Sequence, residues 1–437
     1  MPIQSIRDKA LALLAIMAMV CAVGCRHSDD PDMPELPDMP DKPIPEMVNL
    51  CLQVSFDRQK EATRTDGADN DGYDYDISGE FEKISSLRVI IIRNVPNVDE
   101  NGDTIKDING KPETALRLVE ANRLVATDEY GHPRNDNLEF NVVDNESKRI
   151  YLIANESSLQ APSESWASAT QFLNEAYSIG TEVANFDNLT NWTVSMPDIS
   201  DAGTVTDGLF SDSKALIPML PLTEFFDIFV NVKRLNLPED TYKSHLFITR
   251  AAAKATFYLD PTGLDPTYSN VQITSISLSG IGAEEYVFPN HTVYSKGKYQ
   301  DAVKPDVEMY ITDFKTPTDK TLTYLMDNLS INMVEKGTQP VTQSRAIHGP
   351  IYFPESILKG DEKYMVTVTL STGMEFKAPL ETNILNIDGN DAVARDTHLK
   401  IEMSFTPMSL TVEAIEAPYN SVSLNPGFGE IYYPSED

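Results

Sequence analysis

The sequence predicts an all-β protein with two tandem β-sandwich domains, placed after an N-terminal leader and a proline-rich tether. Short segments in which apolar and polar side chains alternate recur along the chain, and a period of two is typical of half-buried strands. Proline, glycine and asparagine separate these segments, with 28 prolines and 21 glycines in 437 residues, as expected for turns. Roughly 410 residues follow the leader, which corresponds to two or three domains of ordinary size.

The first 24 residues predict a cleaved secretory leader. Arg7 and Lys9 precede an apolar run at 10–23, and this run is shorter than the roughly 20 residues that a membrane span needs. Ala22, Val23 and Gly24 then stand directly before Cys25. This arrangement resembles the lipobox of bacterial lipoproteins, which implies that Cys25 is acylated and becomes the first residue of the mature chain. An ordinary leader followed by a chance cysteine is the alternative.

Residues 25–46 are expected to form an extended, acidic tether. Prolines occupy positions 31, 34, 37, 40, 43 and 45, and a spacing of three matches the three residues per turn of polyproline II. Such a tether reaches roughly 60 Å, at ~3.1 Å per residue. The run at 28–30 (SDD) resembles the acidic signal of some Bacteroidetes lipoproteins, which implies transport to the outer face of the outer membrane.

The net charge of the chain argues against two classes of partner, and its cysteine content argues against disulfide bonds. The whole chain carries a formal charge of −32, and loss of the leader leaves about −33. Such acidity argues against binding of nucleic acid or of an anionic membrane surface. Cys51 is the only cysteine left beside Cys25, so we expect no disulfide.

The globular part begins with a strongly alternating segment at 48–56. Its predicted inward side chains are Val48, Leu50, Leu52, Val54 and Phe56. A polar, glycine-containing segment follows at 57–80, and it contains Arg58 and Arg64. Loops of this composition are the usual sites of proteolysis.

Further strands are predicted at 87–92, 138–143, 150–154, 245–259, 271–279, 364–370, 399–405 and 410–414. One amphipathic helix is predicted with Ser163 as its N-cap, and its apolar face would contain Trp166, Ala169, Leu173, Ala176 and Tyr177. The composition changes at 235–244 (LNLPEDTYKS). We therefore predict an N-terminal domain at 47–240 and a C-terminal domain at 241–437.

A search for catalytic or metal-binding patterns is negative. HExxH, GxSxG, P-loop and CxxC patterns are absent, and the six histidines are scattered. The acidic stretch at 99–110 lacks the glycine and glutamate of a calcium loop, so we interpret it as a hairpin with an Asn-Gly turn. Gly280 and Gly282 are interpreted as a turn. We therefore expect no catalytic residue, no cofactor, no metal and no enzymatic activity.

Seven short motifs occur together in the globular part. They are 150–155 (IYLIAN), 216–219 (LIPM), 249–255 (TRAAAKA), 351–356 (IYFPES), 394–398 (ARDTH), 417–419 (APY) and 424–429 (LNPGFG). In this order, and behind a lipoprotein leader, they resemble the fimbrillin family of Bacteroidia, the subunits and anchors of type V pili. The resemblance covers roughly 48–437. Asp396 stands where that family often has asparagine.

The resemblance implies both a fold and a route of assembly. The fold would be two transthyretin-like sandwiches. A trypsin-like protease would cut after Arg64, or else after Arg58, and the strand at 48–56 would be lost. A strand of a neighbouring subunit, best supplied by the C-terminal stretch 410–433, would then fill the vacated groove.

The same resemblance implies the partners and the location. Expected partners are other fimbrial subunits, the outer membrane through the lipid, and a ligand on a host or bacterial surface. Shaft, tip and anchor roles remain open. The alternative is a surface glycan-binding lipoprotein of a nutrient-uptake system. Such proteins present exposed aromatic platforms, whereas this chain has only Trp166 and Trp192.

Overall fold

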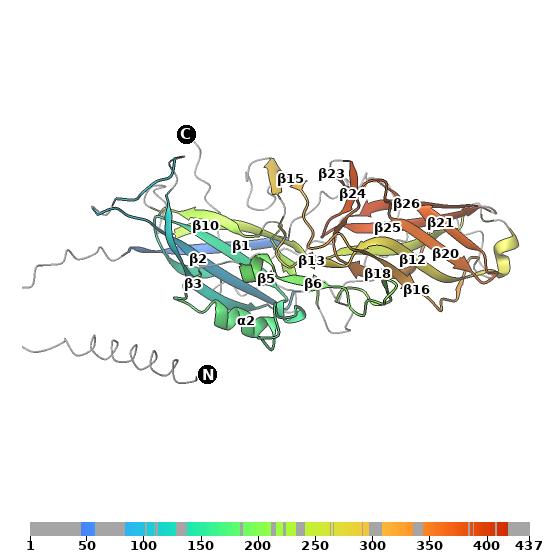
Figure 1. The fold of residues 1–437 in the computed structure, drawn as a ribbon, viewed down its shortest axis with the longest axis horizontal. Coiled ribbons are helices and arrows are strands. Elements are labelled where there is room, and N and C mark those ends of the chain that lie inside the picture. The colour runs from blue at the N-terminus through green and yellow to red at the C-terminus, as the bar shows by residue number, and fades with distance from the viewer. Residues whose placement is uncertain are drawn as a thin grey trace, which may run out of the picture. The chain divides into compact units, whose positions relative to one another are not determined.

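The computed structural model describes residues 45–417 except 57–83, 101–102, 109, 111, 128–137, 184–186, 211–215, 222–223, 233–240, 263, 265, 291, 297–307, 335–343, 383–384, 388 and 407–408. Strands dominate these residues, and helices are few and short (Figure 1). The prediction of an all-β protein is therefore confirmed.

The chain forms a first group of strands, an insertion and a second group. The first group consists of β1 (Met47–Phe56), β2 (Ser86–Pro96), β3 (Thr114–Ala126), β4 (Glu139–Val143), β5 (Glu146–Ala154), β8 (Met219–Leu220), β9 (Phe226–Val230) and β10 (Thr241–Arg250). The insertion contains η3 (Glu156–Ser158), α2 (Ala169–Ala176), α3 (Asp187–Thr190), β6 (Thr193–Ser195) and β7 (Thr204–Val205).

The second group runs from β11 (Ala253–Asp260) to β26 (Ser409–Ala417). Between them lie η5 (Pro266–Asn270), β12 (Gln272–Gly282), β13 (Glu284–Tyr286), β14 (Thr292–Lys296), β15 (Glu308–Asp313), β16 (Thr321–Met326), β17 (Ile331–Asn332), β18 (Arg345–Phe353), β19 (Ser356–Ile357), β20 (Met365–Leu370), β21 (Glu375–Pro379), β22 (Glu381–Thr382), β23 (Leu385–Ile387), β24 (Asn390–Val393) and β25 (His398–Thr406).

The first group folds into what we call the first sandwich. Its strand order is β3-β2-β5-β8-β10-β1-β4, with β9 paired to β5. Leu50 and Leu52 of β1 share one core with Val89 of β2 and Leu152 of β5, so the two ends of this sheet face each other. The short strand β8 joins them by pairing with both β5 and β10.

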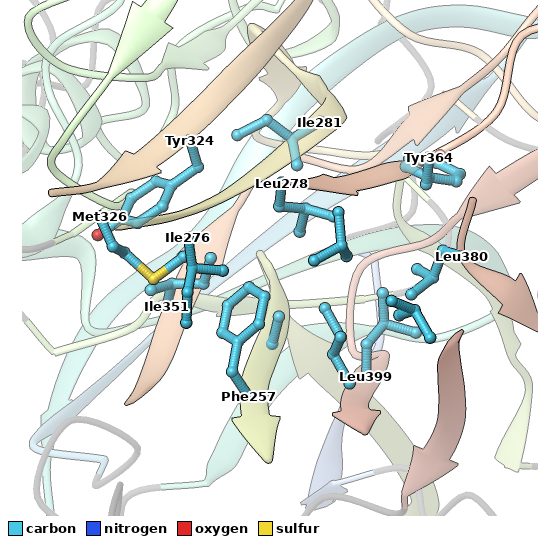
Figure 2. Close-up of a cluster of buried hydrophobic side chains, with 14 of the residues drawn as sticks. Phe257, Ile276, Leu278, Ile281, Tyr324, Met326, Ile351, Tyr364, Leu380 and Leu399 are labelled. Carbon is cyan, nitrogen blue, oxygen red and sulfur yellow. The ribbon is translucent and has the colours of Figure 1, made fainter. Parts of the chain in front are cut away.

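The second group forms what we call the second sandwich, from a sheet of order β18-β11-β25-β26-β22 and a sheet of order β21-β20-β12-β16-β7. Figure 2 shows side chains of the two sheets directed toward each other, among them Phe257 and Leu399 from one sheet and Ile276, Leu278 and Tyr324 from the other. Alternate residues of β12, β16 and β20 are buried, as expected where one face of a strand covers a core.

The two sandwiches share one scheme of strand pairing. In the first, β1 pairs antiparallel with β4 and parallel with β10. In the second, β11 pairs antiparallel with β18 and parallel with β25. The facing sheets correspond as well, because β2 pairs with β3 and β5 while β12 pairs with β16 and β20. The outer partner of β5 is β9, and the outer partner of β20 is β21.

The prediction of one long strand at 245–259 is wrong. The chain forms β10 and β11, which are separated at Ala251 and Ala252, and the two strands belong to different sheets. The segment 245–259 contains no proline or glycine, so its sequence carries no signal for such a change of sheet. The division into domains at 240/241 stays a prediction, although β10, which begins at Thr241, pairs with β1 of the first sandwich.

The insertion after β5 covers the outer face of the first sandwich. Phe172 and Leu173 of α2 pack with Tyr151 of β5 and Ile90 of β2. The helix begins later than predicted, because Ser168 rather than Ser163 is its N-cap: the Ser168 side chain accepts a hydrogen bond from Gln171 N. Such a bond satisfies one of the free amides of the first helical turn.

The insertion also connects the two sandwiches. β6 pairs with β13 and β7 pairs with β16, and Leu209 N donates to Tyr352 O at 2.8 Å. Its core contains Val287 and Phe288 from the second group beside Trp192. Side chains and strands from both groups are therefore packed together here.

Gly280 and Gly282 do not form the predicted turn. Both belong to β12, whose pairing with β16 shifts register between Ser279 and Ile281. Gly280 has a φ of +98°, and a Cβ at Gly282 would lie 2.4 Å from Glu355 O. Glycine is therefore needed for a bulge and for a close backbone approach.

Candidate interaction site at the first strand

β1 occupies an interior position in its sheet. Its residues from Asn49 to Phe56 pair with β10, and those from Met47 to Cys51 pair with β4. Leu52 N adds a hydrogen bond of 2.9 Å to Leu138 O. Removal of β1 would therefore expose two hydrogen-bonding edges, one on β4 and one on β10.

The inward face of β1 is completely buried. Val48 is 4% exposed, and Leu50, Leu52 and Val54 are 0% exposed, which confirms the predicted alternation for these four residues. The side chain of Phe56 lies outside the described residues. At about 1.5–3 kcal/mol for each fully buried aliphatic side chain, the four side chains stabilise the bound strand by roughly 6–12 kcal/mol.

The outward face of β1 is less exposed to solvent than the alternation predicts, because Cys51 on that face is also buried. Asn49 Nδ2 lies 3.6 Å from its sulfur. Burial, together with the nearby Glu139 carboxylate, raises the pKa of the Cys51 thiol to about 11. The thiol is therefore protonated and shielded while β1 is in place.

The other predicted site residues lie outside the described residues. Cys25 belongs to 1–44, and Arg58 and Arg64 belong to 57–83. The segment 57–83 connects β1 to β2. Lipidation at Cys25 and cleavage after Arg64 or Arg58 therefore remain predictions.

The proposed donor stretch is partly folded into its own sheet. β26 pairs antiparallel with β25 along its whole length, from Ser409 to Ala417. Leu410 and Val412 are buried. The rest of the stretch, 418–433, lies outside the described residues. To serve another subunit, residues 410–417 would have to leave β25.

A fully buried ionic cluster lies where the insertion meets the second sandwich. Glu285, Glu355 and Arg395 have no exposed side-chain surface. Arg395 Nη2 lies 2.7 Å from Glu355 Oε1 and 3.9 Å from Glu285 Oε2. Glu355 N donates to Glu285 Oε2 at 3.0 Å, and Arg395 Nη1 donates to Val287 O at 3.0 Å.

This cluster holds more carboxyl groups than guanidinium groups. Burial raises the pKa of Glu285 to about 8, with Glu355 adding to the effect, while Arg395 opposes it. Glu285 therefore retains its proton near neutral pH. The sequence motifs include Glu355 and Arg395 but not Glu285. The sequence analysis missed Glu285, because only the fold places β13 next to the other two residues.

Asp396, the departure from the family motif, also has a structural role. It adopts the left-handed conformation with φ of +61°, which aspartate tolerates better than most residues. Its Oδ1 lies 3.1 Å from Arg250 Nη1, and its backbone N donates to Ala252 O at 2.9 Å. Asp396 thus ties the end of β10 to the start of β25.

The tryptophans provide no exposed aromatic platform. Trp192 is 1% exposed and its Nε1 donates to Gln160 O at 2.9 Å. Trp166 is partly buried against Phe172. Neither tryptophan therefore offers the fully exposed ring that the glycan-binding alternative expects.

The described part of the chain contains neither a cluster of metal ligands nor a helix suited to span a membrane. Within it, no group of three or more His, Cys, Asp or Glu side chains is placed to hold a metal ion. The helices described there include none that is both long and apolar enough to cross a membrane.

Comparisons by sequence find no matching family model and no matching curated protein. Comparisons by structure find fimbrial proteins. The tip fimbrial protein Mfa3 of Porphyromonas gingivalis, with a C-terminal truncation, is 11% identical, with 85% of this chain and 99% of that chain covered and a TM-score of 0.43. A fimbrilin (fimA) of the same species is 12% identical, with 84% and 97% covered and a TM-score of 0.39.

A fimbrial assembly protein of Parabacteroides distasonis is 11% identical, with 86% of this chain and 99% of that chain covered and a TM-score of 0.35. The identities and TM-scores of all three are too low to carry an argument about function.

Proposed function

We propose that this chain is a structural subunit of a type V fimbria, made as a lipoprotein and assembled at the outer membrane by protease-triggered strand exchange. Its partners would be other fimbrial subunits, and the assembled fimbria would support adhesion to a host or bacterial surface. The chain would act as a structural protein and not as an enzyme.

One observation carries this proposal. The first strand of the globular part lies between β4 and β10 with its inward face buried, and the segment that contains Arg58 and Arg64 follows it directly. A cut in that segment separates β1 covalently from the remainder of its sandwich. The vacated position would offer two backbone edges and an apolar floor, which are the requirements for strand addition.

The energetics favour exchange over simple release. Because roughly 6–12 kcal/mol of apolar burial holds β1, a cut alone would leave the strand bound. A competing strand with apolar side chains at alternate positions could displace it stepwise, since each new contact replaces one that is lost. The stretch 410–433 is the proposed donor, and its strand β26 has buried Leu410 and Val412 at alternate positions.

The experiment compares variants in a piliated strain. Arg64→Ala, combined with Arg58→Ala, should accumulate lipidated monomer without polymer. A chain truncated after Pro418 should be cut but should fail to donate. Lys60→Ala is the matched control, because it removes another charge from the same segment while both arginines remain. Polymers resistant to SDS at normal levels in both test variants would exclude strand exchange.

Lipidation is tested separately. Cys25→Ala should abolish incorporation of radiolabelled palmitate and release the protein from the outer membrane. Cys51→Ala should label normally. Full labelling of the Cys25→Ala variant would show that the lipobox interpretation is wrong.

A further inference from the structure

The two ends of the first sandwich meet along one seam. β3 and β4 are the first and last strands in the order of that sheet, and side chains of β3 contact the backbone of β4. Glu120 Oε1 accepts a hydrogen bond of 2.6 Å from Val143 N, and Arg123 Nη1 donates one of 3.2 Å to Glu139 O. Arg123 Cζ also lies 4.6 Å from the centre of the Phe140 ring. These contacts are called the seam below.

The seam uses the edge of β4 that faces away from β1. Leu52 N donates to Leu138 O, and Asp144 N donates to Glu46 O, so the even-numbered backbone groups of β4 and its flanks face β1. Backbone groups alternate between the two edges of a strand, and the odd-numbered groups that the seam holds therefore point outward. The seam and β1 do not compete for the same groups of β4.

Strands that face β1 across the core fix the position of Glu120. Its other carboxylate oxygen lies 2.9 Å from Lys148 Nζ of β5, and the side chain of this lysine is completely buried. Lys148 also pairs with Glu146 at 3.1 Å, and Glu146 accepts a hydrogen bond of 2.8 Å from Arg93 of β2. Two carboxylates and two cations balance each other here. Because a buried charge is costly without its partner, Glu120 is tied to β5 and β2.

β4 would lose its ladder partner together with β1. In the described part of the chain, all ladder pairs of β4 are with β1, since β4 ends the strand order. A strand of five residues without a hydrogen-bonded neighbour is poorly fixed. The contacts that remain are the seam, the buried side chains of Phe140 and Val142, and a bond of 2.9 Å from Val232 N to Asp144 Oδ1 just beyond the strand.

We propose that Glu120 and Arg123 are positioning residues that hold β4 when β1 leaves, so that the vacated place keeps both of its edges. This inference rests on the proposed strand exchange. The arriving strand would bind β10 on one side and β4 on the other, as β1 does. Its pairing would therefore be parallel to β10 and antiparallel to β4.

Release of a labelled strand from the nicked protein tests the proposal. The chain is cut between β1 and β2 by limited trypsin treatment and loaded with an isotopically heavy peptide of residues 46–57. Excess unlabelled peptide is then added, and native mass spectrometry follows the loss of the heavy peptide. Glu120→Ala with Arg123→Ala should release it at least about tenfold faster than the unaltered protein, because two charge-assisted hydrogen bonds to β4 are missing.

Two further variants serve as controls. Glu139→Gln removes an exposed charge of β4 and keeps the carbonyl group that Arg123 binds, so it should release the peptide like the unaltered protein. Arg123→Lys keeps a donor for that carbonyl and should stay near the unaltered rate, whereas Arg123→Ala should not. Rescue by lysine ties the effect to the contact with β4.

Hydrogen exchange of the uncut chain separates positioning from general stability. While β1 is bound, the amide of Val143 should exchange at least about tenfold faster in the double variant, because its acceptor is gone. The amides of Phe140 and Val142 face β1 and should stay protected. Loss of their protection in the uncut double variant would show that the two residues stabilise the monomer generally, and would overturn the proposal.

The peptide experiment also distinguishes this proposal from the proposed function. No uptake of heavy peptide by the unaltered nicked protein would overturn both. Uptake with equal release rates for the unaltered protein and the double variant would overturn the role of Glu120 and Arg123 alone, while strand exchange would stand.

Discussion

Glu285, Glu355 and Arg395 form the most buried ionic group among the described residues, and this burial has consequences for pH dependence. The pKa of Glu285 is raised from its usual 4.5 to about 8, so the folded state binds this proton more tightly than the unfolded state does. The resulting stability is fully present below pH 4.5 and is lost as the pH rises through about 8. Ionisation then places a second carboxylate beside a single guanidinium.

Glu285→Gln should therefore flatten the stability profile. Between pH 5 and pH 9, the melting temperature of the unaltered protein should fall more steeply than that of the variant, because glutamine cannot ionise. Thermal unfolding followed by circular dichroism measures both. Glu284→Gln, on the same strand but partly exposed, is the matched control and should follow the unaltered protein. Parallel profiles for Glu285→Gln and the unaltered protein would contradict the assignment.

The reactivity of the Cys51 thiol shows whether β1 stays bound in its sheet. Because its pKa is about 11 and its side chain is buried, the native thiol should react with a disulfide reagent at pH 8 at least about 100-fold more slowly than a free thiol. Denaturation should restore the full rate. The measurement uses a chain that begins at residue 26, in which Cys51 is the only cysteine. Rapid labelling of the native protein would show that β1 opens readily.

At the level of single elements, β1 is an interior strand at the start of the described residues. It is bound on both edges and on its inward face, whereas an exposed edge strand has one neighbour only. Its position also explains why assembly would require a competing strand. Proteolysis breaks one covalent connection and leaves the hydrogen bonds and the apolar contacts in place.

A cut between β1 and β2 should therefore leave a folded, nicked protein. After limited trypsin treatment, the N-terminal fragment should co-elute with the remainder in gel filtration and separate only under denaturing conditions. Leu50→Ala with Leu52→Ala should weaken retention, since each costs about 2–5 kcal/mol. Gln53→Ala, on the more exposed face, is the control. Immediate loss of the fragment from the unaltered protein would contradict this prediction.

At the scale of the whole molecule, the contacts of the insertion with both sandwiches bear on how cooperatively the chain unfolds. β6 and β7 each pair with a strand of the second group, and Val287 and Phe288 pack beside Tyr151 and Trp192 of the first group and the insertion. The rings of Tyr151 and Phe288 are 5.4 Å apart in an edge-on arrangement. We expect these contacts to make unfolding cooperative across both sandwiches.

Phe288→Ala tests this coupling. The unaltered protein should unfold in a single calorimetric transition, whereas the variant should lose about 3–5 kcal/mol and show two transitions. Phe405→Ala is the control, since Phe405 lies in the core of the second sandwich and its loss should destabilise without separating the transitions. Two transitions in the unaltered protein would show that the sandwiches unfold independently.

The sequence by itself determined the fold class and the strands β1, β2, β4, β5, β12, β20, β25 and β26. The alternation at 48–56 predicted β1 and its buried face, because a strand that covers a core on one side must repeat with a period of two. The same rule gave β12, β20 and β25. The strand β3 was missed, because the charged residues Arg117, Glu120 and Arg123 interrupt the alternation of its apolar side chains.

Only the tertiary structure decided which strands are neighbours. Strand pairing joins residues far apart in the chain, such as Asn49 and Thr241, and no local pattern records the partner. The same holds for Glu285, whose pKa is raised first by burial in the fold and then by Glu355, a residue 70 positions away. The period of the side-chain pattern shows which face of a strand is buried. The partner of a strand and the pKa of a buried group depend instead on which distant residues the fold places next to them.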